Sequence, residues 1–439
     1  AKGWSYAEVL PYFRRAQCHE TGVDAYRGGD GPLRVRTGDT PNPLYEAWFE
    51  AGRQAGYPVS TDMNGFQQEG LAKMDQTVHR GRRCSAAVAY LRPAMARPNL
   101  DVVTGAMTTR VVFVGRRAVG VEYVRRGTSV VARAEREVIV ASGAINGPQL
   151  LMLSGVGAAD ELRPLGIPVV HDLPGVGRNL QDHLECYVQV ACTQPVTLYP
   201  LLKPLRRTLV GIEWLLFNTG PGATSHFENG GFIRSRAGVE HPDLQYHFFP
   251  MAITYYGTLP ASGHGFQAHV GPMRSPSRGF VRLRSADPGA HPIIEPDYMS
   301  HEADWREFRA GVRLTREIFA QKAFDPYRGE ELAPGAGVQT DGEIDAFLRG
   351  HVESAYHPCG TCKMGTDPMA VVDPECRVRG LDGLRVVDAS IMPSIPSGNL
   401  NAPTIMLAEK AADMILGDDP LPPSNAPYWV HPDWRTAQR

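Results

Sequence analysis

The sequence has no run of eighteen apolar residues, so it predicts no membrane-spanning helix. It also lacks an excess of cationic side chains, because 45 Lys and Arg stand against 47 Asp and Glu for a net charge of −2. Bulk nucleic-acid binding needs a field of Lys and Arg that neutralises phosphates. The charge balance therefore argues against nucleic acid as a partner and favours small molecules.

Cysteine is present but not in a pattern that would define a scaffold. The seven cysteines are odd in number and irregularly spaced, which argues against a disulfide framework and favours a reducing compartment. One C-x-x-C pair, Cys359 and Cys362, has no second pair and no H-x-x-x-H sequence to complete it. Since a structural zinc site needs four ligands, we predict no metal site.

A third absence concerns nucleotide binding. Many dinucleotide-binding folds approach the pyrophosphate through a G-x-G-x-x-G turn between a strand and a helix. The G-x-G triplets at residues 155–157 and 175–177 have Asp160 and Leu180 where the third glycine would stand. This sequence therefore contains no such fingerprint.

What the chain does contain is enough apolar sequence for two or three domains, with 439 residues of which 43% are hydrophobic. Residues 1–95 combine a helix at 5–17 with loops, and we interpret them as a covering segment that includes part of a cofactor domain. Short alternating runs then predict a β meander that feeds a buried strand, at 100–104, 110–114, 118–124, 129–134 and 137–141. A turn of small residues and a helix follow, which is typical of half a nucleotide-binding unit.

A second sheet is predicted within residues 190–345, where runs such as 244–249 and 280–283 alternate beside a helix at 304–320. The chain then returns to the cofactor domain with a buried strand ending in Asp388 and a helix at 404–416. We predict an α/β fold, α+β overall, in which a discontinuous Rossmann-like domain accompanies a substrate domain with an antiparallel sheet flanked by helices. The expected segments are 1–95, 96–189, 190–345 (substrate domain), 346–420 (cofactor domain) and a tail at 421–439.

Two segments near the C-terminus carry side chains suited to alcohol chemistry. His357 lies in the sequence Tyr-His-Pro-Cys-Gly-Thr-Cys, and Asn399 lies in Gly-Asn-Leu-Asn-Ala-Pro-Thr after an intervening strand. A histidine can take the proton of a substrate hydroxyl, and an asparagine can donate a hydrogen bond to the oxygen that remains. A histidine beside a proline is by itself more often structural, so the interpretation depends on the whole motif.

These motifs resemble the glucose-methanol-choline family of flavin-dependent alcohol oxidoreductases. Residues 143–148, followed by Ser-Gly-Val-Gly at 154–157, are close to one of the family's signature motifs and depart from it at Gly147, where the family has Ser or Thr. Residues 173–183 are similar to the family's next turn on the cofactor side. The resemblance extends over essentially the whole chain.

The resemblance implies FAD as cofactor, an alcohol substrate and an electron acceptor. His357 would be the base for hydride transfer to the flavin, and Asn399 matches a second catalytic position that is His in some members and Asn in others. Because an amide cannot take a proton, Asn399 would only donate a hydrogen bond. Asn401 is the neighbouring alternative. The residues expected to contact FAD are Val103, Asp388, Ala389, Asn401, Pro403 and Thr404.

The resemblance also indicates a substrate. Glu228 lies between aromatic residues and a Gly-Gly pair, an arrangement suited to a quaternary ammonium group held by charge and by aromatic faces. In choline-oxidising members the matching carboxylate pairs with that cation, and Tyr356 resembles an aromatic wall of the same cage. Choline would give betaine aldehyde, which the same site could oxidise again. The alternatives are another primary alcohol, or a non-catalytic fragment that cannot hold FAD alone.

The family's N-terminal nucleotide-binding unit is not found in this sequence, and its opening, Ala-Lys-Gly-Trp-Ser-Tyr, resembles an internal segment. A targeting signal would therefore not be observable here, and we expect a cytoplasmic or peripherally membrane-associated protein. Residues 203–217 place cationic side chains before an amphipathic stretch containing a tryptophan, which fits either a membrane-surface helix or a core helix of the substrate domain. Association into a homo-oligomer is left open.

Overall fold

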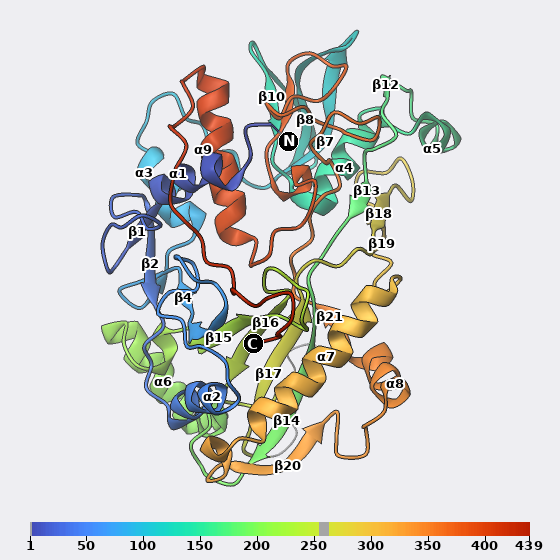
Figure 1. The fold of residues 1–439 in the computed structure, drawn as a ribbon. Coiled ribbons are helices and arrows are strands. Elements are labelled where there is room, and N and C mark those ends of the chain that lie inside the picture. The colour runs from blue at the N-terminus through green and yellow to red at the C-terminus, as the bar shows by residue number, and fades with distance from the viewer. Residues whose placement is uncertain (1, 254–262) are drawn as a thin grey trace.

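The computed structural model describes residues 2–253 and 263–439. Figure 1 shows two halves. One contains a large antiparallel sheet crossed by the long helix α7 (Glu302–Phe319), and the other contains smaller sheets with α4 (Gly143–Leu153) and α9 (Asn401–Leu416). Each half encloses a hydrophobic core of its own.

The remaining elements fall into three groups. The other helices are α1 (Tyr6–Ala16), α2 (Pro43–Gln54), α3 (Arg92–Ala94), α5 (Ala159–Leu162), α6 (Pro204–Phe217) and α8 (Asp341–His351). The large sheet has the order β20 (Arg328–Ala333), β14 (Leu184–Cys192), β17 (Gly265–Pro272), β16 (Leu244–Phe249), β15 (Asn229–Ile233) and β3 (Gly70–Lys73), and β21 (Glu353–Ser354) also pairs with β14. The smaller sheets are β1 (Gln17–His19), β2 (Leu33–Thr37) and β4 (Asp75–Gln76); β5 (Val78–His79) and β6 (Arg82–Arg83); β7 (Ala106–Val114), β8 (Arg117–Arg125) and β9 (Thr128–Arg133); β10 (Val138–Val140) and β22 (Leu384–Val386); β11 (Val156–Gly157) and β12 (His171–Asp172); β13 (Arg178–Leu180), β18 (Gly279–Arg282) and β19 (Ile293–Glu295).

Period-two alternation gives the large sheet two chemically different faces. Apolar side chains of β14, β16 and β17 point toward α2 and α7, where the ring of Trp48 stacks on Phe248 with centroids 5.0 Å apart. The intervening residues of the same strands are polar and lie on the opposite face. They are Glu185, Tyr187 and Gln189 of β14, Gln245 and His247 of β16, and Gln267 and His269 of β17.

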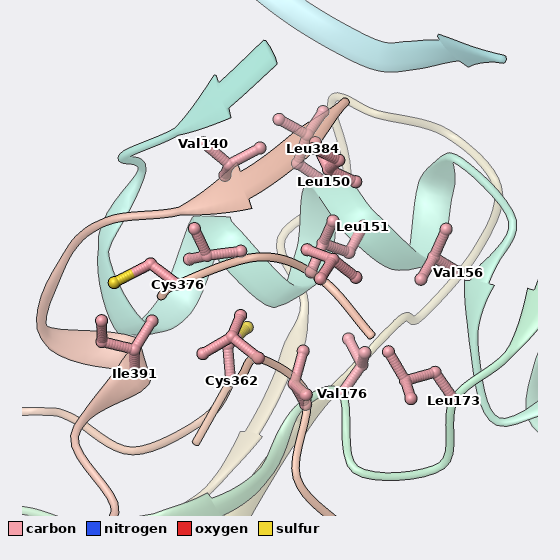
Figure 2. Close-up of a cluster of buried hydrophobic side chains, with 14 of the residues drawn as sticks. Val140, Leu150, Leu151, Val156, Leu173, Val176, Cys362, Cys376, Leu384 and Ile391 are labelled. Atoms are coloured by element: carbon pink, nitrogen blue, oxygen red, sulfur yellow. The ribbon is translucent and has the colours of Figure 1, made fainter. Parts of the chain in front are cut away.

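The other half is built on the parallel pair β10 and β22, in register from Val138 with Leu384 to Val140 with Val386. Both strands were expected from their apolar sequence, and they pair although most of the chain separates them. Figure 2 shows the apolar side chains that α4 and the loops pack beneath this pair, with Cys362 and Cys376 among them. The predicted fold class, mixed α/β with a discontinuous cofactor part, is confirmed.

Several local expectations need adjustment. Residues 100–104 were expected to form a strand, but they have no strand partner, and Val102 and Val103 are exposed. The meander begins instead at Ala106. Helix α9 begins at Asn401, so Pro403 lies in its first turn and not before it. A β-rich run without a neighbouring strand cannot satisfy its backbone by pairing, which explains why propensity alone failed at 100–104.

The segment predicted as a cover contributes directly to the large sheet. Strand β3 forms its edge, and α2 packs against its apolar face. Strand β14, which begins inside the segment predicted for the cofactor domain, lies in the large sheet as well. Among the residues that the structure describes, no helix combines the length and the hydropathy needed to cross a bilayer.

Candidate active site

The structure brings the two predicted catalytic side chains together. His357 follows β21 in a loop, Asn399 precedes α9, and 3.3 Å separates His357 Nε2 from Asn399 Nδ2. The Gln245 amide donates a hydrogen bond to Asn399 Oδ1 over 2.8 Å. The polar face of the large sheet therefore meets the loops of the cofactor half at this pair.

Asp182 anchors the loop that carries His357. Its Oδ1 accepts a hydrogen bond from the His357 backbone N–H at 2.8 Å. Its Oδ2 accepts from the Tyr298 hydroxyl at 2.6 Å and from Ser354 Oγ at 2.5 Å. The next residue, His183, holds the ring of His357, with the two Nδ1 atoms 3.1 Å apart. Two consecutive residues immediately before β14 thus fix both the backbone and the ring of the candidate base.

Burial favours the neutral form of His357, His183 and His247. It lowers the pKa of His357 below its ordinary value, although the charges of Asp182 and Glu185 oppose the shift. Burial, together with the adjacent His357 ring, lowers the pKa of His183 to about 3. Burial lowers the pKa of His247 to about 4. A neutral imidazole, which has one unprotonated ring nitrogen, is what a general base for a hydroxyl requires at neutral pH.

A carboxylate lies on the same polar face as these histidines. Glu185 Oε1 is 2.8 Å from His269 Nδ1, and its charge acts on the pKa of His357 and of His247. Burial alone would raise the pKa of Glu185, but the interactions with His269, His247 and Tyr187 together outweigh it, so the pKa is lowered. The group is therefore ionised at neutral pH.

Phe227 supplies an aromatic ring beside His269, the hydrogen-bond partner of this carboxylate, and beside His247. It stacks on Phe249 with centroids 4.8 Å apart, and its centroid lies 5.4 Å from that of His269 and 5.9 Å from that of His247. The polar face thus combines one ionised carboxylate with an aromatic surface, which is the chemistry that holds an organic cation.

Glu228, the carboxylate singled out from the sequence, lies in different surroundings. It is 1% exposed, and its carboxylate accepts hydrogen bonds from Thr40 Oγ1 at 2.8 Å and from Thr224 Oγ1. Burial by itself would raise the pKa of Glu228. The hydrogen bonds lower the pKa by more than burial raises it, so the pKa lies below its ordinary value. The structure therefore shows Glu228 as an ionised group already satisfied by neighbouring hydroxyls.

Tyr356, the other predicted substrate contact, has a ring that is 77% exposed. Its backbone adopts a positive φ of 62°, and its N–H donates to Ser354 Oγ at 2.8 Å. The left-handed conformation turns the chain sharply just before His357. An aromatic wall at Tyr356 remains a prediction.

The carboxyl ends of β10 and β22 have the features of a dinucleotide site. The Asp388 carboxylate accepts hydrogen bonds from the Gly143 N–H at 2.8 Å and from the Ser390 N–H at 2.7 Å, and it thereby joins the two strand ends. Gly143 has a φ of +77°, and a Cβ on it or on Gly398 would meet no atom within 4 Å. Open backbone at the ends of adjacent parallel strands is where such folds bind nucleotides, so the residues present fit FAD.

The other predicted cofactor contacts are distributed around this opening. Ala389 directly follows Asp388, and Asn401, Pro403 and Thr404 lie in the first turn of α9, where Pro403 has no N–H and the Thr404 N–H donates to the Leu400 carbonyl. Val103 lies in the exposed coil before β7 and is 47% exposed.

The C-x-x-C pair is part of the cofactor half's core. Cys359 and Cys362 are fully buried, and burial raises the pKa of the Cys359 thiol to about 12 and raises the pKa of Cys362 as well. Such thiols are inert packing groups. Within residues 2–253 and 263–439, no group of three or more His, Cys, Asp or Glu side chains is arranged to hold a metal ion.

Sequence reasoning did not identify the residues that surround the His357 and Asn399 pair. These are His183, Glu185, Gln245, His247 and His269. The signal was the alternation of polar and apolar residues in β14, β16 and β17. This alternation predicts that the sheet has a polar face. Only the packing of the sheet against the cofactor half shows that this face meets His357.

A neutral histidine paired with an amide, next to a dinucleotide-binding strand pair, defines a flavin-dependent oxidoreductase. The GMC oxidoreductase N-terminal model matches residues 1–185, and the C-terminal model matches residues 275–408. The chain belongs to the GMC oxidoreductase family, and the predictions of an enzyme and of FAD as its cofactor are confirmed.

Curated relatives and solved structures agree with this assignment. The oxygen-dependent choline dehydrogenase of Brucella ovis is 59% identical over 441 residues, covering 100% of this chain and 80% of the relative. The mitochondrial choline dehydrogenase of Homo sapiens is 59% identical over 431 residues, covering 98% and 73%. Pyridoxine 4-oxidase from Mesorbium loti superposes with a TM-score of 0.85 at 30% identity, covering 95% of this chain and 79% of that structure. A formate oxidase superposes with a TM-score of 0.87 at 25% identity, covering 95% and 79%.

Proposed function

We propose that the protein catalyses the FAD-dependent oxidation of choline to betaine aldehyde. The observation that carries the proposal is that a neutral base meets the polar face that carries a carboxylate: His357 pairs with Asn399, and Glu185 lies close enough to influence the pKa of His357. The identity with curated choline dehydrogenases over the whole chain supports the same substrate.

The chain's own residues account for the proton, the oxygen and the cation. His357 Nε2 takes the hydroxyl proton, and the Asn399 amide donates a hydrogen bond to the oxygen as negative charge develops on it. Asp182 keeps the His357 loop in place through three hydrogen bonds. FAD, when bound, supplies the acceptor for the hydride that leaves the α-carbon, and an electron acceptor later reoxidises it. Loss of one proton and one hydride converts the alcohol into the aldehyde.

We assign the substrate cation to Glu185 in preference to Glu228. A trimethylammonium group donates no hydrogen bonds, so it needs a charge and a surface of low polarity. Glu185 lies on the polar face and pairs with His269, whose ring contacts Phe227, whereas Glu228 is enclosed by Thr40 and Thr224. The role of Glu228 in substrate binding is retained as the alternative assignment.

The test compares choline with its uncharged carbon isostere, 3,3-dimethylbutan-1-ol, in the FAD-loaded enzyme. Glu185→Gln removes the charge but keeps the shape, so KM for choline should rise by about thirtyfold, equivalent to roughly 2 kcal/mol for a partly buried charge pair. KM for the isostere should change less than threefold. Glu228→Gln is the matched variant and should leave the ratio of the two KM values unchanged.

Two outcomes separate the alternatives. Equal changes for both alcohols in both variants would refute choline as the substrate. A selective rise of KM for choline in Glu228→Gln alone would transfer the cation site to Glu228.

Betaine aldehyde hydrate carries the same H–C–O–H unit as an alcohol, so we also propose that the site oxidises it to glycine betaine. Product analysis during turnover tests this step, and accumulation of the aldehyde alone would refute it.

We further propose that α6 contacts a membrane surface carrying anionic lipids. Four apolar side chains along one side of α6 are exposed to solvent. The exposed fractions are 75% for Leu205, 50% for Leu209, 47% for Ile212 and 68% for Leu216. These four recur at helical spacing along one stripe, and none of the residues of α6 is buried. An apolar stripe of this kind on a helix surface is unusual unless a partner covers it.

Charge complementarity favours anionic lipid over a second copy of the chain as that partner. Lys203, Arg206 and Arg207 stand exposed at the start of α6. The β5 and β6 hairpin is adjacent, where Arg82 lies over the Trp214 ring and bonds Asn218, and it adds further exposed arginines. Two copies facing each other here would bring like charges together, whereas an anionic surface neutralises them.

Vesicle co-sedimentation tests this contact. Wild-type protein should pellet with vesicles containing phosphatidylserine and remain in solution with pure phosphatidylcholine. Leu209→Gln with Leu216→Gln should lose at least half of the bound fraction, whereas Val114→Gln, an exposed apolar residue of β7, should bind as wild type. Equal binding by all variants would refute the assignment. A dimer that the α6 variants dissociate in light scattering would assign the stripe to a second copy instead.

A further inference from the structure

We infer that His183 is a positioning residue that fixes the tautomer of His357, so that the Nε2 lone pair of His357 faces the substrate oxygen. The inference deepens the proposed function and rests on His357 as its base. A series of hydrogen-bond contacts supports it. The series begins at a backbone carbonyl and continues through four side chains, ending at Gln245.

The starting point is the carbonyl of Met273. It lies 3.2 Å from His183 Nε2, and a carbonyl oxygen can only accept, so His183 Nε2 carries the proton. His183 is 3% exposed, and burial lowers the pKa of its ring to about 3, although the carbonyls of Met273 and Pro396 oppose the shift. A neutral ring protonated at Nε2 has a lone pair at Nδ1.

The proton position on His183 then determines the proton position on His357. His183 Nδ1 and His357 Nδ1 lie 3.1 Å apart. Because the lone pair of His183 accepts, His357 must donate from Nδ1–H. Burial lowers the pKa of His357, so its ring is neutral and the remaining lone pair is at Nε2.

The third step accounts for the groups beyond His357. With a lone pair at Nε2, His357 accepts from Asn399 Nδ2 across 3.3 Å. The other amide atom, Asn399 Oδ1, then accepts from Gln245 Nε2 at 2.8 Å. Every contact is therefore satisfied when the carbonyl of Met273 sets the direction. His357 Nε2 is then the unprotonated ring nitrogen, and it takes the proton of a substrate hydroxyl that replaces Asn399 Nδ2 as its hydrogen-bond donor.

Mutation of His183 should release this constraint. With an apolar side chain at position 183, His357 Nδ1–H has no acceptor there, and the ring can move its proton to Nε2, where it cannot act as base toward the substrate. Loss of the correct tautomer costs up to about 10⁴-fold in turnover where a carboxylate sets it. The acceptor here is a neutral imidazole and holds the tautomer less strongly than a carboxylate does. We therefore expect a smaller loss in kcat, about 10- to 100-fold, with KM for choline within threefold of wild type.

The direct measurement is the ¹⁵N spectrum of histidine side chains in the purified protein, with the His357 signals identified by their absence in His357→Gln. Wild type should show a protonated Nδ1 and an unprotonated Nε2 at His357. His183→Leu should shift His357 toward a protonated Nε2. His183→Asn, whose Oδ1 can accept near the original Nδ1 position, should restore the wild-type tautomer and most of the turnover.

The outcomes separate this inference from the proposed function. A protonated Nε2 at His357 in the wild type would overturn it, and so would a His183→Leu variant with unchanged tautomer and turnover. If His183→Leu fails to fold, the wild-type spectrum and His183→Asn still decide. The expected tautomers without any oxidation of choline would refute the substrate assignment and leave the positioning role of His183 standing.

Discussion

Removing the imidazole of His357 should slow the reaction much more than removing the amide of Asn399, although the two groups touch. Loss of a general base typically costs about 10²- to 10⁴-fold in rate. Asn399 contributes one hydrogen bond to an oxygen that gains charge, worth about 1.5–3 kcal/mol or roughly 10- to 150-fold. Comparing the centres of these two ranges, we expect kcat of His357→Ala to fall roughly tenfold or more below that of Asn399→Ala.

The contacts also predict how the two effects combine. Asn399 is held between His357 Nε2 at 3.3 Å and Gln245 at 2.8 Å. Once His357 is absent, the amide has lost one of the two partners that orient it. The double variant should therefore be at most about threefold slower than His357→Ala alone, because groups that act as a unit are not additive.

The assay is steady-state choline oxidation with an artificial electron acceptor, normalised to the FAD content of each variant from its visible absorbance. His79→Ala, which removes an exposed histidine of β5, is the matched control and should retain wild-type turnover. Equal and small losses in His357→Ala and Asn399→Ala would remove His357 from the role of base. Fully additive losses would show that the two side chains act separately.

Two further predictions follow from the site and the core. Because only neutral His357 can take a proton and burial lowers its pKa, kcat/KM should be constant at neutral pH and fall as the pH drops through that lowered pKa. Asp182→Asn deletes a charge that raises the pKa of His357, so this decline should move to lower pH; a move to higher pH would refute the electrostatic account. Phe248→Ala should destabilise the chain by about 3–5 kcal/mol, since a fully buried ring leaves a cavity. Urea unfolding followed by fluorescence of the stacked Trp48 measures this loss, with Val114→Ala as the exposed control; a change below about 1 kcal/mol would contradict the packing.

Local patterns were sufficient for much of the fold. The strands ending near Val140 and Asp388 are short apolar runs followed by small residues, so both were predicted as strands; the structure adds that they form a parallel pair. Helix α1 begins after Ser5, whose side chain takes part in a capping box with Glu8, so its start was also readable. These features depend on neighbours in the sequence, which the sequence displays directly.

Features that depend on distant partners were less accessible. Val103 and its neighbours have strand-forming side chains but no strand beside them, so they remain coil. Strand β3 and helix α2 lie far before β15 in the chain, yet they complete its sheet and cover it. No local signal marks such long-range pairing, because it depends on the surface left free once the other elements have packed.

The choice between Glu228 and Glu185 shows the same limit at the site. Glu228 was favoured because of its neighbours in sequence, but adjacent residues of an extended chain point in opposite directions. Phe227 therefore reaches the polar face, while Glu228 turns to Thr40 and Thr224. Glu185 alternates with core residues of β14, so its direction follows from the apolar side of that strand. The sequence does not show where His357 lies relative to this face. Asp182 and His183 fix that position through their contacts with His357.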